Sequence, residues 1–217
     1  TEGPHVTDAK LTTGHIWLDA DNDGDLDLFA TNWTSTESNG GNDLYLNDGP
    51  PHYTFKRHEG GDLVTTPRAT SGMAAADYDR DGDIDLYLSL FSTGNTPERD
   101  LLFRNDAPPR RWIRFRLEGG RTDAPSSTGS NRSAIGATVR VRAVIAGRDT
   151  WQRRDVGVGT HYTDDAHLTA HVGLGDASKA AEVIVEWPSG MIETFHQVEA
   201  DAEYRLREGH GHLRPTD

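Results

Sequence analysis

The fold of this chain is decided by nine residues, Asp19-Ala-Asp21-Asn-Asp23-Gly24-Asp25-Leu-Asp27, which recur 58 positions later as Asp77-Tyr-Asp79-Arg-Asp81-Gly82-Asp83-Ile-Asp85. Carboxylates at every second position of a short loop can converge on a hard cation, and calcium takes about 6 to 8 oxygen ligands. The glycine at position six allows the sharp turn, because glycine adopts positive φ without a steric cost. Each copy is therefore a candidate calcium loop.

The alternative is a solvated acidic turn, since aspartate is common in turns. Five aspartates in nine residues repel one another unless a divalent ion lies among them, and the crowding occurs twice. Magnesium fits less well, because it requires near-octahedral geometry and keeps its waters. We therefore expect two Ca²⁺ sites. The expected ligands are the side chains at positions 1, 3, 5 and 9 and the carbonyls at position 7, that is Asp19, Asp21, Asp23, Asp25, Asp27, Asp77, Asp79, Asp81, Asp83 and Asp85.

The residues after each loop distinguish these sites from EF-hands. An EF-hand places a bidentate Glu at position 12, whereas this chain has Ala30 and Leu88 there. The segments 26–30 and 84–90 alternate apolar residues with period two, which is typical of half-buried strands. Strand-like segments also follow at 42–48, 53–56 and 99–105, so each unit of about 58 residues reads as strand, loop and further strands. This period suits the blade of a β-propeller.

The repeated segments resemble the VCBS/FG-GAP repeats of integrin-like propellers and many exported bacterial proteins. The resemblance rests on residues 19–27 with Leu44-Tyr-Leu-Asn47, and on residues 77–85 with Leu101-Leu-Phe-Arg-Asn105. A propeller typically needs about 4–8 blades to close. We therefore expect a partial propeller whose open edges are completed by preceding blades or by another subunit.

The pair Pro108-Pro109 predicts a boundary, because neither ring can donate a ladder hydrogen bond. Period-two segments begin at residues 111, 138, 151, 168, 182, 191 and 202, and they predict an all-β sandwich or barrel-like domain. The expected organisation is two blades at 1–108, a β-domain at 109–209 and a tail at 210–217.

This second half is similar to the ASPIC/UnbV domain of the cartilage acidic protein family. The matching residues are 131–141, His171-Val-Gly-Leu-Gly175 and Val183-Ile-Val-Glu-Trp187-Pro-Ser-Gly190. The resemblance implies an exported, calcium-binding protein that serves adhesion or recognition.

Composition supports that expectation. The chain has 217 residues and a formal charge of −13 without a basic patch, which argues against nucleic acid as a partner. It contains no run of 18 apolar residues, so no membrane span is expected. Weak calcium sites are typical of extracellular modules, and we expect a secreted, periplasmic or cell-surface location.

Other residues offer competing sites. A catalytic group would be sought at His161 and Asp164, and a transition-metal site at His161, His167 and His171. However, His167 and His171 lie about 13 Å apart on a strand and cannot share one ion, so a packed role is expected for His171. The pair His210 and His212 could bind a metal weakly. The five tryptophans are candidates for sugar stacking, with core packing favoured for Trp112 and Trp187.

The leading hypothesis is a non-enzymatic, calcium-binding extracellular module for adhesion, assembly or recognition of a protein or carbohydrate ligand. The alternatives are the C-terminal part of a secreted or biosynthetic enzyme, such as a polysaccharide lyase, hydrolase or tailoring enzyme, with structural calcium, and a subunit of an extracellular polymer.

Overall fold

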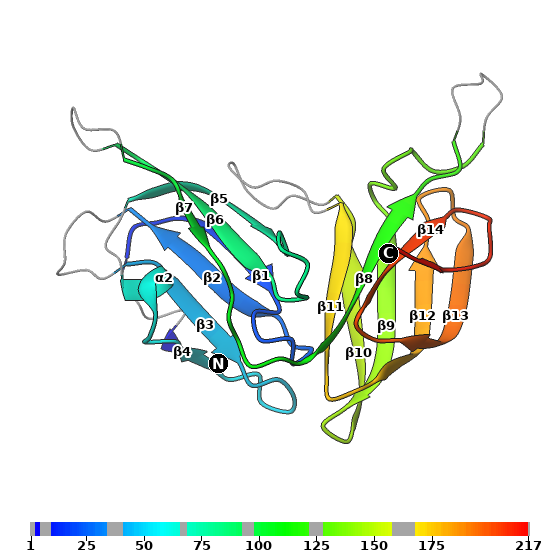
Figure 1. Ribbon diagram of the computed structural model, residues 1–217, viewed down its shortest axis with the longest axis horizontal. Helices are drawn as coiled ribbons and strands as arrows, with labels where there is room; N and C mark the ends of the chain where they lie inside the picture. Colours follow the sequence, from blue (N-terminus) through cyan, green and yellow to red (C-terminus); the bar gives the residue numbers. More distant parts are fainter. Residues whose placement is uncertain are drawn as a thin grey trace. The chain divides into compact units, whose positions relative to one another are not determined.

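The computed structural model describes residues 3–4, 10–33, 41–65, 69–92, 98–121, 128–157 and 168–216. These residues form mostly β-strands and include the short helix α2 (Asp62–Thr65). They divide into two compact units (Figure 1). The first comprises the described residues within 1–20 and 25–107, and the second comprises those within 21–24, 108–159 and 166–217.

The first unit contains two antiparallel meanders. One sheet has the order β1-β2-β3-β4, with β1 (Thr12–Leu18), β2 (Asp27–Asn32), β3 (Asp43–Asn47) and β4 (Phe55–Arg57). The other has the order β5-β6-β7, with β5 (Thr70–Ala76), β6 (Asp85–Leu90) and β7 (Leu101–Phe103). Each acidic loop joins the first two strands of its sheet, and neither sheet closes into a barrel. The arrangement fits two blades of a partial propeller, as the sequence predicted.

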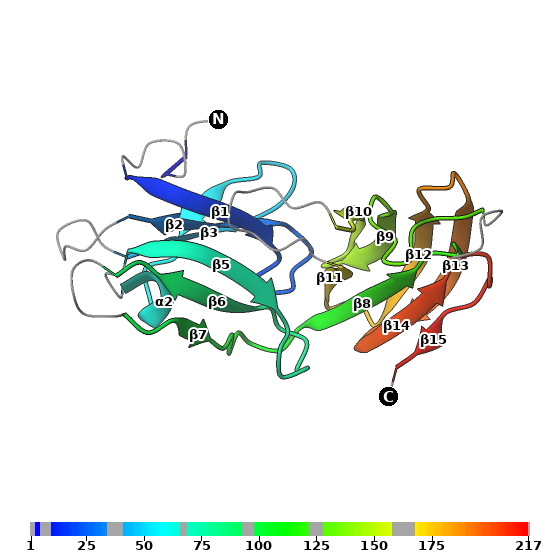
Figure 2. The same cartoon turned by 90° about the horizontal axis from the view of Figure 1, so that it is seen from above.

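The two sheets of this unit pack through the apolar side chains of alternate strand positions. Figure 2 shows them as neighbouring layers. The hydroxyl of Thr13 in β1 donates to the carbonyl of Thr70 in β5 at 2.9 Å, which joins the first strands of the two sheets. Both first strands carry a register shift at the equivalent place, so the repeat extends to backbone detail. The buried apolar cluster contains Ile16, Leu18, Phe29, Leu44, Val64, Met73, Ala75, Leu86 and Leu88.

The second unit is a β-sandwich of two four-stranded sheets, and no sheet closes into a barrel among the described residues. One sheet has the order β10-β9-β12-β13, with β9 (Thr138–Ile145), β10 (Arg148–Asp155), β12 (Lys179–Glu186) and β13 (Ile192–Glu199). The other has the order β11-β8-β14-β15, with β8 (Arg111–Glu118), β11 (Thr169–Gly175), β14 (Ala202–Arg207) and β15 (Arg214–Pro215). Strands β8 and β14 run parallel, and the other pairs are antiparallel.

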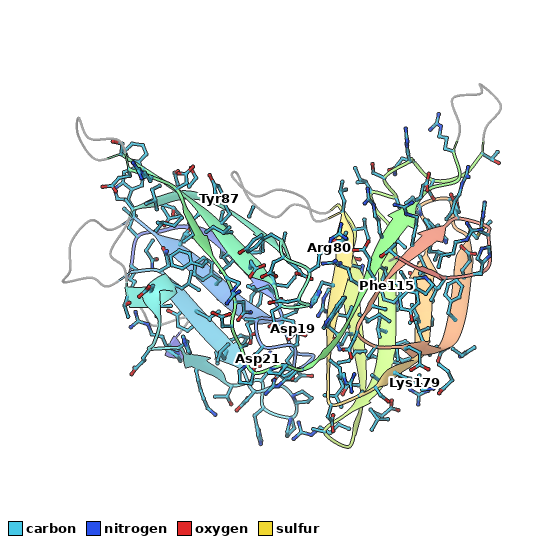
Figure 3. The ribbon with its side chains drawn as sticks, in the orientation of Figure 1. Asp19, Asp21, Arg80, Tyr87, Phe115 and Lys179 are labelled. Atoms are coloured by element: carbon cyan, nitrogen blue, oxygen red, sulfur yellow. The ribbon has the colours of Figure 1, made fainter. Side chains whose placement is uncertain are left out.

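The sandwich core follows directly from the period-two pattern of its strands. Val139 and Val141 of β9 lie beside Val185 and Val183 of β12, and all four are fully buried. Phe115 of β8, labelled in Figure 3, is 0% exposed. Fully burying each such side chain contributes about 1.5–3 kcal/mol to folding. The sandwich therefore has an extensive core of its own.

A buried carboxylate fastens the end of β14 to two other segments of the sandwich. Glu208 Oε2 accepts hydrogen bonds from the backbone N–H groups of Gly120 and Ser130, both at 2.7 Å. Its Oε1 accepts from the hydroxyls of Ser130, at 3.0 Å, and of Ser189. Burial raises the pKa of Glu208, but the hydrogen bonds from Ser189, Gly120 and Ser130 outweigh it, and the net pKa is lowered. The group is therefore held as a carboxylate.

Candidate metal centres

The second acidic loop brings three carboxylates together. Ligand atoms of Asp77, Asp79 and Asp85 all lie within 4.8 Å of one another. Asp85 is 1% exposed and Asp77 is 9% exposed, whereas Asp79 faces solvent. Two buried negative charges next to a third are costly to hold unless a cation compensates them.

The first loop repeats this arrangement. Asp19, Asp21 and Asp27 form the equivalent cluster within the same 4.8 Å limit, and Asp19 and Asp27 are buried. Figure 3 labels Asp19 and Asp21 in this loop. Positions 1, 3 and 9 of both copies therefore converge.

The loop backbone explains this convergence. In the second copy the N–H of Gly82 donates to Asp77 Oδ2 at 3.1 Å, and the N–H of Asp83 donates to Asp81 Oδ1 at 3.0 Å. Arg80 and Gly82 have φ angles of 65° and 99°, and the first copy has positive φ at the same two positions. These left-handed residues interrupt the strand alternation, which folds the loop back over its own first aspartate.

The ninth residue of each loop is held by the backbone. Asp85 Oδ2 accepts from the N–H of Tyr78 at 3.0 Å, and Oδ1 accepts from the N–H of Asn105 at 2.8 Å. Burial is the main cause that raises the pKa of Asp85, and the charges of Asp79 and Asp81 add to it, while the two backbone hydrogen bonds oppose it. The net pKa of Asp85 is therefore raised, chiefly because the carboxylate is buried.

Two asparagines support the loops, Asn47 at the end of β3 and Asn105 two residues after β7, and sequence reasoning did not assign them this role. The N–H of Asn47 donates to Asp27 Oδ1 at 2.8 Å, and its side chain donates to the carbonyl of Leu26 at 3.1 Å. Asn105 makes the matching bonds to Asp85 and, at 3.3 Å, to the carbonyl of Ile84. A signal was available, because each asparagine follows the ninth loop residue by 20 positions.

Only some of the predicted ligands belong to the two carboxylate clusters of the described residues. Asp23 and Asp81, the expected position-five ligands, are not members of the carboxylate clusters formed by the described residues. The assignment of the carbonyls of Asp25 and Asp83 stays a prediction. The side chain of Asp25 lies against Gly49, where an added Cβ would fall 1.9 Å from its Oδ2.

The donor chemistry of both clusters fits a hard divalent cation. All the converging groups are carboxylates, which suit calcium, magnesium or manganese, and neither cluster includes an imidazole or thiolate. Calcium is favoured because it accepts irregular geometry in a flexible loop. Its bound charge would offset the mutual repulsion of the clustered carboxylates.

The other predicted site residues do not form a second centre among the described residues. His161, His167 and Asp164 lie outside the described part of the chain. His171 Nε2 lies 2.8 Å from Asn22 Oδ1, and the imidazole stacks on the ring of Trp112, so it has the packed, hydrogen-bonded environment that the sequence predicted.

One histidine of the pair near the C-terminus, His212, is held by hydrogen bonds. His212 Nδ1 lies 2.6 Å from the carbonyl of His210, and its Nε2 accepts from Arg214 Nε at 2.9 Å. Both ring nitrogens of His212 therefore already have partners within the protein.

The tryptophan predictions are confirmed for one residue and wrong for another. Trp187 is 3% exposed and donates its indole N–H to Glu193 at 2.8 Å. Trp112 is half-buried at the start of β8 and stands outside the core cluster, with the guanidinium of Arg114 5.6 Å from its ring centroid. Strand alternation explains the difference, because Trp112 lies on the face of β8 that carries Arg114, whereas the core residues Ile113 and Phe115 lie on the other face.

Charge is divided unevenly along the chain. Residues 1–107 contain 20 acidic and 7 basic residues, whereas residues 108–217 contain 15 of each. The whole net charge of −13 thus belongs to the first 107 residues, and ten of their acidic residues lie in the two loops. Among the described residues, no helix is long and apolar enough to cross a bilayer.

The fold and the loops define a class of protein: repeated, strand-borne acidic loops followed by a β-sandwich. Comparison with protein-family models identifies the two parts. Residues 19–88 match the FG-GAP-like repeat, and residues 127–213 match the ASPIC and UnbV family. The chain therefore carries an FG-GAP-like repeat region followed by an ASPIC/UnbV domain, as the sequence predicted. A search of curated proteins found no match.

Proposed function

We propose that this chain is a calcium-stabilised extracellular module that serves adhesion, assembly or recognition of a protein or carbohydrate. Two Ca²⁺ ions are assigned, one to each acidic loop. The proposal is supported most directly by the cluster of Asp77, Asp79 and Asp85, in which two carboxylates are buried within 4.8 Å of a third. The match of residues 19–88 to an FG-GAP-like repeat is consistent with it.

In this proposal, different positions of each loop have different structural roles. Position 9 joins the loop to the segment after β7, since Asp85 accepts hydrogen bonds from Tyr78 in the loop and from Asn105. The glycine at position 6 lets the backbone turn over position 1. Bound calcium adds stability because its ligands converge in the folded chain alone.

Recognition of a ligand is the second part of the proposal. Integrin-like repeats and an ASPIC/UnbV domain on one chain favour a binding role over catalysis. An enzymatic role would rest on His161 and Asp164, which lie outside the described residues, so no geometry supports it over binding.

Calorimetric titration of the whole chain with CaCl₂ tests the metal assignment. We expect two calcium ions per chain, and we expect Asp77→Asn with Asp79→Asn to remove one of them. Magnesium at the same concentration serves as the competing ion. Absence of bound calcium at millimolar concentrations would overturn the proposal.

The recognition role is tested separately with a panel of immobilised glycans and extracellular matrix proteins. The chain is applied with calcium and with a chelator. Binding of a panel member that is lost in chelator supports the role. Turnover of a polysaccharide, or no binding to any member, contradicts it.

A further inference from the structure

Arg110 pairs with the first acidic loop. Its NH1 atom lies 3.1 Å from Asp21 Oδ2 and 3.6 Å from Asp23 Oδ2. Asp21 belongs to the carboxylate cluster, and Asp23 is a predicted ligand. The three residues belong to the same compact unit.

The backbone of Arg110 is constrained on both sides. It follows Pro109, whose ring restricts the backbone, and it immediately precedes β8. A side chain anchored in this way loses less freedom when it pairs than one on a mobile loop. The arginine side chain is 40% exposed and its partners are 29% and 28% exposed, so solvent weakens the pair without abolishing it.

The second loop lacks this feature. Asp79 and Asp81 occupy the equivalent positions, and neither forms an ion pair with any residue in the described part of the chain. The second loop has Arg80 at the position of Asn22, and Arg104 interacts electrostatically with Asp79 while pairing with Asp106. The two loops therefore share their carboxylate cluster but differ in whether a guanidinium is paired directly with a clustered carboxylate.

We propose that Arg110 competes with calcium at the first loop, which makes the two loops unequal sites. The guanidinium neutralises part of the charge of residues 19–27 when no metal is bound, and it opposes a second positive charge when metal arrives. The loop at residues 77–85 has no such directly paired competitor among the described residues, so Arg110 acts on the first site alone. This inference rests on the proposed function and specifies how its two sites differ.

The sign of the effect follows from electrostatics. A fixed positive charge near a ligand carboxylate repels an incoming cation whatever the detailed coordination. Because the pair is partly exposed, we expect a modest effect of roughly three- to tenfold in affinity. If Arg110 instead orients Asp21 for binding, its removal weakens calcium binding.

The experiment measures one loop at a time by calorimetric titration of the whole chain with CaCl₂. The double substitution Asp79→Asn with Asp81→Asn disables the second loop. In that background, the calcium affinity of the chain is measured with and without Arg110→Ala. Asp21→Asn with Asp23→Asn disables the first loop and gives the matched background in which Arg110→Ala should change nothing. Arg153→Ala is the charge control, because it removes a guanidinium that pairs with Asp155 on β10.

We expect Arg110→Ala to tighten calcium binding at the first loop roughly three- to tenfold, with little effect from Arg153→Ala. An unchanged or weaker affinity in Arg110→Ala overturns the inference while leaving calcium binding itself intact. Failure of both single-loop backgrounds and of the wild-type chain to bind calcium overturns the proposed function as well.

Discussion

Asp79→Asn should have opposite effects on stability in the presence and absence of calcium. Asp79 is the solvent-facing member of the second cluster, so its substitution leaves no cavity and breaks little of the fold. Without metal, the change removes one of several mutually repelling charges and should slightly raise the melting temperature. With calcium bound, the same substitution removes a ligand and should lower the melting temperature.

The size of the calcium-dependent effect can be estimated. Extracellular sites have Kd values of about 10⁻⁴–10⁻³ M. At about 10 mM calcium one such site adds roughly 1.4–2.7 kcal/mol. Loss of one carboxylate ligand, taken as about a tenfold loss of affinity, removes roughly 1–1.3 kcal/mol of this stabilisation. For a unit of this size that corresponds to a fall of about 4–10 °C in the melting temperature.

The assay is thermal unfolding followed by circular dichroism, with CaCl₂ or with EGTA. Glu59→Gln is the matched control, because it makes the same carboxylate-to-amide change at an exposed position of the first unit, outside both loops. An equal fall in both buffers would show that Asp79 has a structural role without metal. A wild-type melt that does not respond to EGTA would refute the reasoning entirely.

Three further substitutions test the contacts that hold the second loop and the sandwich. Asn105→Ala removes side-chain hydrogen bonds to the carbonyls of Ala20 and Ile84, and urea unfolding should show a loss of about 1–3 kcal/mol. Glu208→Gln should cost about 1.5–3 kcal/mol at neutral pH. Because the folded pKa of Glu208 is lowered, its contribution is present above the unfolded value of about 4.3 and is lost as pH falls through the folded pKa, so urea unfolding should show wild type and variant converging in acid. Phe115→Ala should cost about 3–5 kcal/mol by the same measurement, because the ring is fully buried in the sandwich.

The all-β class and the position of both loops were accessible from sequence, because each depends on a local pattern. Alternation of apolar residues identifies a strand without knowledge of its partner. The pairing of β8 with β14 in parallel is not encoded locally, since residues 113 and 202 lie far apart in sequence. The two-residue strand β15 is too short to carry a periodic signal.

Local sequence patterns also fail to predict some of the geometry within the acidic loops. The carboxylates at positions 1, 3 and 9 lie close together in both loops, and position 5 is not a member of either cluster among the described residues. Period-two reasoning assumes an extended backbone, whereas residues 80 and 82, on either side of Asp81, adopt positive φ. The support from Asn47 and Asn105 depends on strand pairing and therefore on tertiary structure.

The two units differ in what holds them together, and this decides where calcium matters. The described sandwich residues bury twenty apolar side chains in one cluster, whereas the first unit buries nine. The first unit also carries the entire net negative charge of the chain. A small core and strong self-repulsion leave little stability in reserve, so neutralising the loops has its largest effect in this unit. Calcium removal should therefore loosen the blades before it affects the sandwich.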